Sequence, residues 1–186
     1  MKLKPILVAV AVAVTLSGCT PAATVVPEKQ PLPHDGPLIL EHHGSACLPY
    51  PKFDHVALGT MMDVPEGTDI RIISVEPLNA VNADIGSESV MFSSRENRLY
   101  GYSWPLNKKY GKPWAEAIPA VGAVLPAGST SDLVTEITPT KPGETVHVPS
   151  MRIVYEVDGG KRYRADSSYQ MVMSTKDCAD SDQITG

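Results

Sequence analysis

Aromatic and lysine side chains concentrate in one short stretch of the chain, residues 100–114. This stretch holds five of the eleven aromatic residues. Aromatic rings with polar edges suit an exposed surface that stacks on a sugar ring or on a side chain of a partner protein. The lysines add positive charge within a chain whose formal net charge is −5. The candidate binding surface consists of Trp104, Lys108, Lys109, Tyr110, Lys112 and Trp114.

The same aromatic residues have a second interpretation, as part of the core. Tyr100, Tyr102 and Trp104 alternate along an expected strand, so that their side chains share one face. Such a face is more often buried than exposed. Tyr110 and Trp114 lie beyond that strand, and for these two residues both interpretations stay open.

Histidines and methionines raise the question of a metal site. His42 and His43 are adjacent, and neighbouring residues of an extended chain point in opposite directions, so both cannot easily bind one ion. Met171 and Met173 share a face of an expected strand and are expected in the core, with soft copper ligation as the alternative. We expect no metal and no other cofactor. A small-ligand or copper- or zinc-binding envelope protein is the second functional hypothesis.

Catalytic signatures are absent from the sequence. It contains no G-x-S-x-G, S-x-x-K or H-E-x-x-H motif and no glycine-rich phosphate-binding loop. The acidic net charge argues against nucleic acid as a partner, because nucleic acid favours basic surfaces. We therefore expect a non-catalytic binding or interaction module that is not an enzyme.

The N-terminus has the consecutive parts of an export signal. Two lysines within the first four residues are followed by an apolar stretch, Ile6–Thr15, and then directly by Leu16-Ser17-Gly18-Cys19. The apolar stretch is too short to cross a bilayer core of about 30 Å. This arrangement resembles the lipobox of bacterial lipoproteins. The resemblance implies a lipoprotein signal peptide over residues 1–18, cleavage before Cys19 and lipid attachment at Cys19.

The resemblance also implies a location and a domain organisation. A lipidated Cys19 would anchor the chain in the cell membrane or the outer membrane, on the extracytoplasmic side, where its partners would be the membrane itself and an envelope protein or glycan. Residues 19–37 are rich in proline and lack apolar periodicity, which predicts a flexible tether. A folded domain is expected over residues 38–178, and an acidic disordered tail over residues 179–186.

Two further cysteines, Cys47 and Cys178, lie near the two ends of the expected domain. In an exported protein such an even pair is expected to be oxidised. The disulfide would close a loop of about 130 residues and stabilise the domain by up to about 5 kcal/mol. A pair of free thiols and a pair of metal ligands are the alternatives, although no C-x-x-C spacing supports the second.

Short alternating segments separated by proline and glycine predict an all-β domain. The clearest signal is a hairpin: Met151, Ile153, Tyr155 and Val157 alternate before Asp158-Gly159-Gly160, and residues 161–166 return. The other expected strands are Phe53–Gly59, Asp69–Glu76, Glu88–Ser93, Arg98–Trp104, Val121–Leu125, Asp132–Thr138 and Tyr169–Met173.

The turn sequences of this β domain also carry a resemblance. Leu125-Pro126-Ala127-Gly128 before a strand and Pro142-Gly143-Glu144 before the hairpin are similar to immunoglobulin-like domains of small secreted bacterial proteins. The expected fold is an antiparallel immunoglobulin-like β-sandwich of about 7–8 strands. At most short helical turns are expected, at Leu78–Ile85 and at Pro113–Ile118, where Pro113 would take the first helical position. Residues 105–112 are expected as a polar, basic loop.

Overall fold

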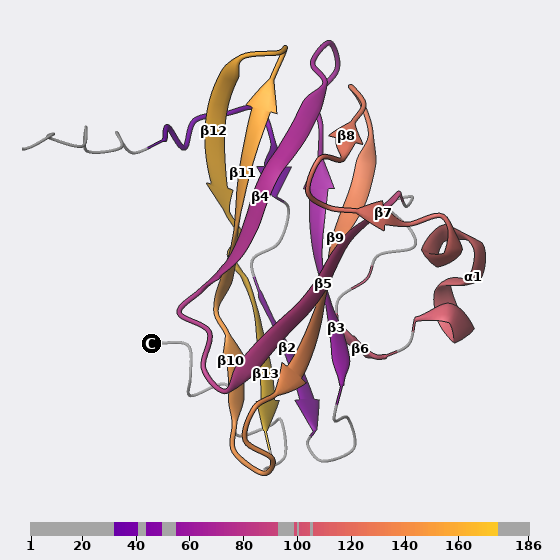
Figure 1. Ribbon diagram of the computed structural model, residues 1–186, viewed down its shortest axis with the longest axis vertical. Coiled ribbons are helices and arrows are strands. Elements are labelled where there is room, and N and C mark those ends of the chain that lie inside the picture. Colours follow the sequence, from indigo (N-terminus) through magenta and orange to yellow (C-terminus); the bar gives the residue numbers. More distant parts are fainter. Residues whose placement is uncertain are drawn as a thin grey trace, which may run out of the picture. The chain divides into compact units, whose positions relative to one another are not determined.

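The alternating segments form the two layers of a β-sandwich (Figure 1). The structure is a computed structural model that describes residues 32–40, 44–49, 55–92, 99, 101–104 and 106–174. One layer is a single six-stranded sheet, called here the large sheet. In order it contains β1 (Ile39–Leu40), β3 (Val56–Asp63), β9 (Thr130–Pro139), β5 (Ala83–Phe92) and β7 (Ile118–Pro119), with β6 (Gly101–Ser103) paired to β3.

The second layer consists of two smaller sheets. The β13 sheet has the order β10 (Val146–Val148), β13 (Tyr169–Ser174) and β2 (Gly44–Pro49). The β11 sheet has the order β12 (Lys161–Asp166), β11 (Ser150–Val157), β4 (Ile70–Leu78) and β8 (Val124–Leu125). The predicted all-β sandwich is confirmed. Among the described strands, β2 and β13 are the one parallel pair, whereas a fully antiparallel fold was expected.

Two clusters of buried side chains fill the space between the layers. The first joins the large sheet to the β11 sheet and includes Met62, Leu133 and Ile153. The second joins the large sheet to the β13 sheet and includes Met171 and Met173, both fully buried. The expectation that these two methionines belong to the core is therefore confirmed.

The predicted C-terminal hairpin is present as β11 and β12. Val157 pairs with Lys161 across a three-residue turn, in which Asp158 (φ 46°) and Gly159 (φ 73°) take the left-handed conformation. Met151 and Tyr155 on the inward face are fully buried. Period-two alternation together with a turn tolerant of positive φ was sufficient to predict this unit.

The helical turn expected at Leu78–Ile85 is wrong. The chain leaves β4 at Leu78 and enters β5 at Ala83. Between them Asn79 (φ 53°) and Asn82 (φ 54°) take left-handed conformations, which end a helix rather than continue it. The side-chain amide of Asn82 also donates to the carbonyl oxygens of Lys141 (3.0 Å) and Glu144 (3.2 Å), so a contact distant in sequence holds this turn.

The second helical region lies earlier than expected. α1 spans Asn107–Ala115 and therefore includes most of the stretch expected as a loop over residues 105–112. Gly111 (φ 41°, ψ −114°) interrupts the helix, so that Pro113 stands near the start of a second short turn. A proline without an N–H is tolerated there, because the first amides of a helical segment have no partner inside it.

The strands on either side of residues 94–97 do not form a hairpin with each other. β5 pairs with β9 and β7, whereas β6 pairs with β3. The strand expected over Val121–Leu125 is reduced to the two residues of β8, and the short strand β7 was not predicted. These short edge strands cover a few positions each, and their partners are distant in sequence.

The N-terminal end of the folded part begins before the predicted boundary at residue 38. The backbone amide of Arg164 donates to the carbonyl oxygen of Pro33 (3.0 Å). A Cβ on Gly36 would collide with the hydroxyl of Tyr155, so this glycine allows the chain to lie against that ring. The final residues assigned to the tether are thus packed on the β11 sheet. Residues 1–31 and 179–186 lie outside the described residues.

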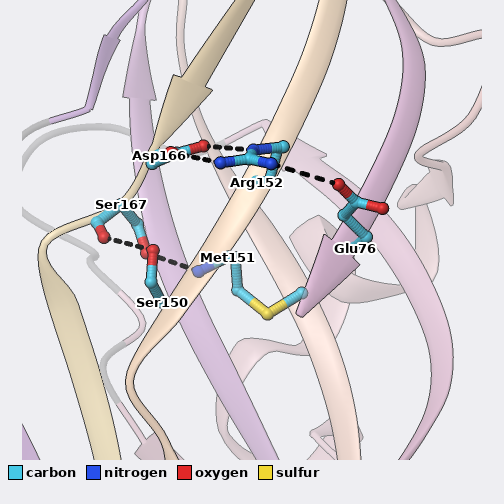
Figure 2. Close-up of polar contacts among 6 residues, drawn as sticks. All are labelled: Glu76, Ser150, Met151, Arg152, Asp166 and Ser167. Carbon is cyan, nitrogen blue, oxygen red and sulfur yellow. Dashed lines mark hydrogen bonds and ion pairs between the residues drawn. The ribbon is translucent and has the colours of Figure 1, made fainter. Parts of the chain in front are cut away.

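Hydrogen bonds and an ion pair connect β11 to the residues at which the chain passes from β12 to β13 (Figure 2). Ser167 lies at this crossing: its amide donates to the carbonyl oxygen of Met151 (2.8 Å), and its hydroxyl accepts from the Met151 amide (2.9 Å). Next to Met151 and Ser167, Arg152 of β11 pairs with Asp166 of β12, and its guanidinium donates two 2.8 Å hydrogen bonds to the Asp166 carboxylate. Glu76 lies 3.7 Å from the same guanidinium. The hydrogen bonds from Arg152 hold the pKa of Asp166 below its usual range.

Replacing Asp166 with asparagine should lower the free energy of unfolding at pH 7 by about 1 kcal/mol, because a two-point charged hydrogen bond is lost. Since the pKa of Asp166 is lower in the folded than in the unfolded state, its stabilisation is present above the unfolded pKa of about 3.9 and is lost as the pH falls through the folded pKa. Urea unfolding of both proteins at pH 7 and at about pH 2–3 should therefore show a difference that shrinks in acid.

The matched control is Glu76→Gln on the other side of the same arginine. Glu76 is more exposed and more distant, and its loss should change the unfolding free energy by less than about 0.5 kcal/mol. Equal effects of the two substitutions would contradict the assigned role of the Arg152–Asp166 pair.

Candidate functional site

The chain segment with the predicted binding surface covers the outer face of the large sheet. Val56 and Leu58 of β3 point into the sandwich, so Ala57 between them points outward. Together with Met91 of β5 and Val134 of β9, Ala57 forms an apolar platform on that outer face. Packed on this platform are Leu99, Leu106 and Tyr110, with Trp104, Trp114 and Ala117 at the margin.

Three partly exposed aromatic rings lie next to one another at the margin of this platform. Trp104 stacks on His55, with ring centroids 5.3 Å apart and planes at 24°. Trp114 meets Trp104 nearly at a right angle, with centroids 5.3 Å apart and planes at 80°. The amide of Trp104 donates to the carbonyl oxygen of His55 (3.0 Å), which holds the two backbones together. We call His55, Trp104 and Trp114 the aromatic row.

A carboxylate adjoins the histidine end of the aromatic row. Nε2 of His55 lies 2.5 Å from Oε1 of Glu136, a contact that is close in distance rather than well aligned as a hydrogen bond. The other oxygen, Oε2, accepts hydrogen bonds from the hydroxyl (2.7 Å) and the amide (3.1 Å) of Ser87. The hydroxyl of Ser87 is the main cause that lowers the pKa of Glu136, and the Ser87 amide and His55 lower it further.

The irregularity in β5 explains why Ser87 reaches Glu136. The pairing of β5 with β9 shifts register between Ile85 and Glu88, so that two residues of β5, Gly86 and Ser87, stand opposite the single residue Glu136 of β9. Such a bulge redirects side chains locally. Here it brings both the amide and the hydroxyl of Ser87 to one carboxylate oxygen.

The order of these polar groups differs from that of a serine nucleophile. In a serine nucleophile the hydroxyl donates to an imidazole, which a carboxylate orients in turn. Here the hydroxyl of Ser87 donates to Glu136, and the imidazole of His55 contacts the other oxygen of the same carboxylate. The arrangement orients a charged acceptor beside aromatic rings.

The structure divides the six residues of the predicted surface into three groups. Trp104 and Trp114 are half-buried and belong to the aromatic row. Tyr110 is only 8% exposed and packs in the platform, so the core interpretation holds for it. Lys112 is exposed and lies 3.6 Å from Glu116. Lys108 and Lys109 belong to the first turns of α1.

The burial of Tyr110 also changes its acidity. Desolvation, with a smaller contribution from the charge of Asp132, raises the pKa of the phenol to about 12. Tyr110 therefore cannot offer its ring to a ligand, in contrast to the expectation that it forms part of an exposed surface.

Sequence reasoning missed the polar half of the site. None of His55, Glu136 and Ser87 was among the six residues of the predicted surface. One signal was available for Glu136: within Asp132–Thr138 it alternates with Leu133 and Ile137, so it belongs to the face that does not enter the sandwich. The β3–β9 register and the β5 bulge, which bring the three side chains together, carry no local sequence signal.

No metal-binding group of three or more His, Cys, Asp or Glu side chains occurs in the part of the chain that the structure describes. His147 lies 2.9 Å from Gln170, between Nε2 and Oε1. His42 and His43 lie outside the described residues. Cys47 lies in β2, whereas its predicted partner Cys178 is outside the described residues as well.

A shallow cavity of about 320 Å³ lies on the other layer, at the end of the β11 sheet. Its walls carry both signs of charge, Arg71 among them, and Oδ1 of Asp69 already accepts from the amide of Ala127 (2.9 Å). This cavity has neither aromatic rings nor a deeply buried polar group aimed into it. The aromatic row with Glu136 is the better candidate site.

Comparison with known proteins adds no functional assignment. No family model and no curated protein matches the chain. Three of the solved structures that match are similar at 8–10% identity. The Vibrio cholerae VesB protease is 10% identical with a TM-score of 0.40, and the match covers 73% of this chain and 32% of that chain. PapD-like domain 7 of human CEP192 is 8% identical with a TM-score of 0.42, and the match covers 86% of this chain and 97% of that chain. The N-terminal domain of PorA is 8% identical with a TM-score of 0.31, and the match covers 77% of this chain and 97% of that chain. The chain thus spans about a third of the length of the VesB protease chain.

Replacing Tyr110 with alanine should lower the free energy of unfolding by about 3 kcal/mol, because a buried aromatic ring leaves a cavity beneath α1. Thermal or urea unfolding of the purified domain measures the effect. Lys112→Ala on the same helix is the control and should stay within about 0.5 kcal/mol of the wild type. A Tyr110→Ala protein as stable as the control would show that the platform is not part of the core.

Proposed function

We propose that the chain is a lipid-anchored lipoprotein of the cell envelope whose β-sandwich is a non-catalytic binding module. The observation that carries the binding proposal is the aromatic row, partly exposed beside the ionised Glu136. Both tryptophans of the chain belong to it. Large amphipathic rings that remain partly exposed are frequent in binding sites, because they combine contact area with few rotatable bonds.

The rigidity of the surroundings supports this proposal. Three members of the site are attached to the large sheet: His55 directly precedes β3, Glu136 lies in β9, and the amide of Trp104 is bonded to the carbonyl oxygen of His55. Trp114 lies in α1 and packs against the platform. A site on paired strands loses little conformational entropy when a ligand binds. The row is therefore pre-organised for contact with a partner.

The anchor proposal rests on the lipobox and on the length of the tether. From Cys19 to Pro31 the chain has room to extend by about 3 Å per residue, which would place the sandwich up to about 40 Å from the bilayer. No helix among the described residues has the length and the apolar character needed to cross a membrane. The proposed location is the extracytoplasmic side of the cell membrane or the outer membrane.

The register of the β13 sheet is compatible with the proposed Cys47–Cys178 disulfide. Cys47 in β2 is the partner of Val172 in the parallel pair with β13. Ser174, the last residue of β13, precedes Cys178 by four positions. Neighbouring strands are about 4.8 Å apart, so four residues have enough length to return to Cys47. The disulfide would link β2, the edge strand of the β13 sheet, to the segment that follows β13.

Lipidation is tested by mass spectrometry of the protein purified from its native membrane. The mature chain should begin at Cys19 and carry the added mass of a diacylglyceryl group and an amide-linked acyl chain. A Cys19→Ser protein should lose the modification and leave the membrane fraction. An unmodified Cys19, or a chain that retains residues 1–18 with no lipid, would contradict the anchor.

Binding by the aromatic row is tested by crosslinking in intact cells followed by purification. A Trp104→Phe/Trp114→Ala protein should lose the crosslinked envelope partner or glycan, because the exposed ring surface is reduced. Phe92→Ala is the control: Phe92 is an exposed aromatic residue of β5 (41%), but its side chain lies on the face opposite Met91 of the platform. Retention of the partner by the double variant, with its melting temperature unchanged, would contradict the site.

A further inference from the structure

We infer that the ligand of this site is a carbohydrate chain with neutral or amino-bearing sugars, lying along a track from Ser87 and Glu136 past His55 to the two indoles. The inference rests on the proposed function, because it names the ligand of that binding site. Its new elements are the class of ligand and the role of Glu136 as the polar anchor of the track.

The track is continuous from residue to residue. Ser87 bonds Glu136 at 2.7 Å, Glu136 contacts His55 at 2.5 Å, and ring centroids are 5.3 Å apart at each of the next two steps. The side chains of His55 and Glu136 are 31% and 22% exposed, so they are accessible while their positions are held. A long, narrow ligand could contact polar and aromatic groups in succession.

The chemistry of the track matches that of a sugar chain. A pyranose ring has C–H groups on its faces and hydroxyl groups around its edge. An indole face such as that of Trp114 offers apolar contact to the C–H groups, and a carboxylate accepts hydrogen bonds from the hydroxyls. Glu136 uses its two oxygens for three contacts, and a carboxylate has about four acceptor sites. One acceptor site therefore stays open for a ligand hydroxyl or ammonium group.

The charge of the track selects among sugars. Ser87 and His55 favour the ionised form of Glu136, so that a negative charge is present there at neutral pH. This charge repels uronic acids and sulfated sugars, and it attracts an amino sugar. The lysines of α1, Lys108, Lys109 and Lys112, are not among the residues of the track, and the exposed Lys112 lies beside Glu116, which partly balances its positive charge.

A protein partner fits the surroundings of the track less well. Stable protein interfaces bury about 800 Å² on each side around an apolar centre. Of the exposed apolar side chains in the described part of the chain, Phe92 is on the opposite face of the large sheet, Ile118 pairs with the inward-facing Val90, and Val124 belongs to the other layer. These three side chains therefore do not extend the aromatic row into a broad apolar patch.

Tryptophan fluorescence reports ligand binding at this track, because Trp104 and Trp114 are the only tryptophans of the chain. The protein is the full mature chain with Cys19→Ser, which carries no lipid. Four tetrasaccharides serve as probes: N-acetylglucosamine and glucose oligomers as neutral ligands, a glucosamine oligomer as the amino ligand and a galacturonate oligomer as the anionic one. At least one neutral or amino oligomer should produce a saturable emission change, and the galacturonate oligomer should not.

Variants assign the roles along the track. Glu136→Gln keeps the shape of the side chain but removes its charge, and it should weaken binding at least tenfold. Trp114→Ala should abolish binding. If the Trp114→Ala protein fails to fold, the Trp114→Phe protein is used in its place, because its smaller ring still packs in the fold. Phe92→Ala should bind as the wild type does. Melting temperatures of all variants separate lost binding from lost folding.

Three results would overturn the inference. The first is binding of the galacturonate oligomer as tight as that of the neutral oligomers. The second is undiminished binding by a folded Glu136→Gln protein. The third is no emission change with any of the four probes. If a protein is nevertheless crosslinked through Trp114 in intact cells, the proposed binding module stands and the carbohydrate is wrong; if that crosslink is also absent, both fail.

Discussion

The pairing of β3 with β9 is the constraint on which both the core and the candidate site depend. Its antiparallel register sets Leu58 opposite Thr135 on the inward face and Ala57 opposite Glu136 on the outward face. Gly59 on the outward side has the backbone of Leu99 against it, in the space that a Cβ would need. A shift of this register by one residue would turn every side chain to the other face, so that the apolar cores and the aromatic row would be lost together.

The site is built where the large sheet is covered from outside. Most of an antiparallel sheet's outer face can remain in water, but here α1 and the residues around it bury Met91 and Val134. The cover is short, and Trp104 and Trp114 at its margin remain partly exposed. Exposed rings beside a fixed carboxylate result from that incomplete cover, and this combination gives the surface a chemistry suited to a ligand with apolar faces and polar edges.

The sequence was a good guide to local patterns and a poor guide to contacts between distant segments. Alternation predicted the β11–β12 hairpin and the burial of Met171 and Met173, because period two and turn chemistry act over a few residues. It did not predict the left-handed Asn82, whose conformation depends on partners about sixty residues away. Likewise the sequence left Tyr110 open between the binding surface and the core, whereas the structure buries it in the platform under α1. The half of the site formed by His55, Glu136 and Ser87 comes from three strands and a bulge, which no local pattern encodes.

The central claim is that the aromatic row is already assembled in the free protein. The most direct measurement is proton NMR of the unliganded domain, with nuclear Overhauser contacts recorded from the imidazole protons of His55 to the indole protons of Trp104, and from Trp104 to Trp114. The account predicts both sets of contacts and one resonance for each indole N–H. Absent contacts, or several slowly exchanging indole resonances, would contradict a pre-organised site.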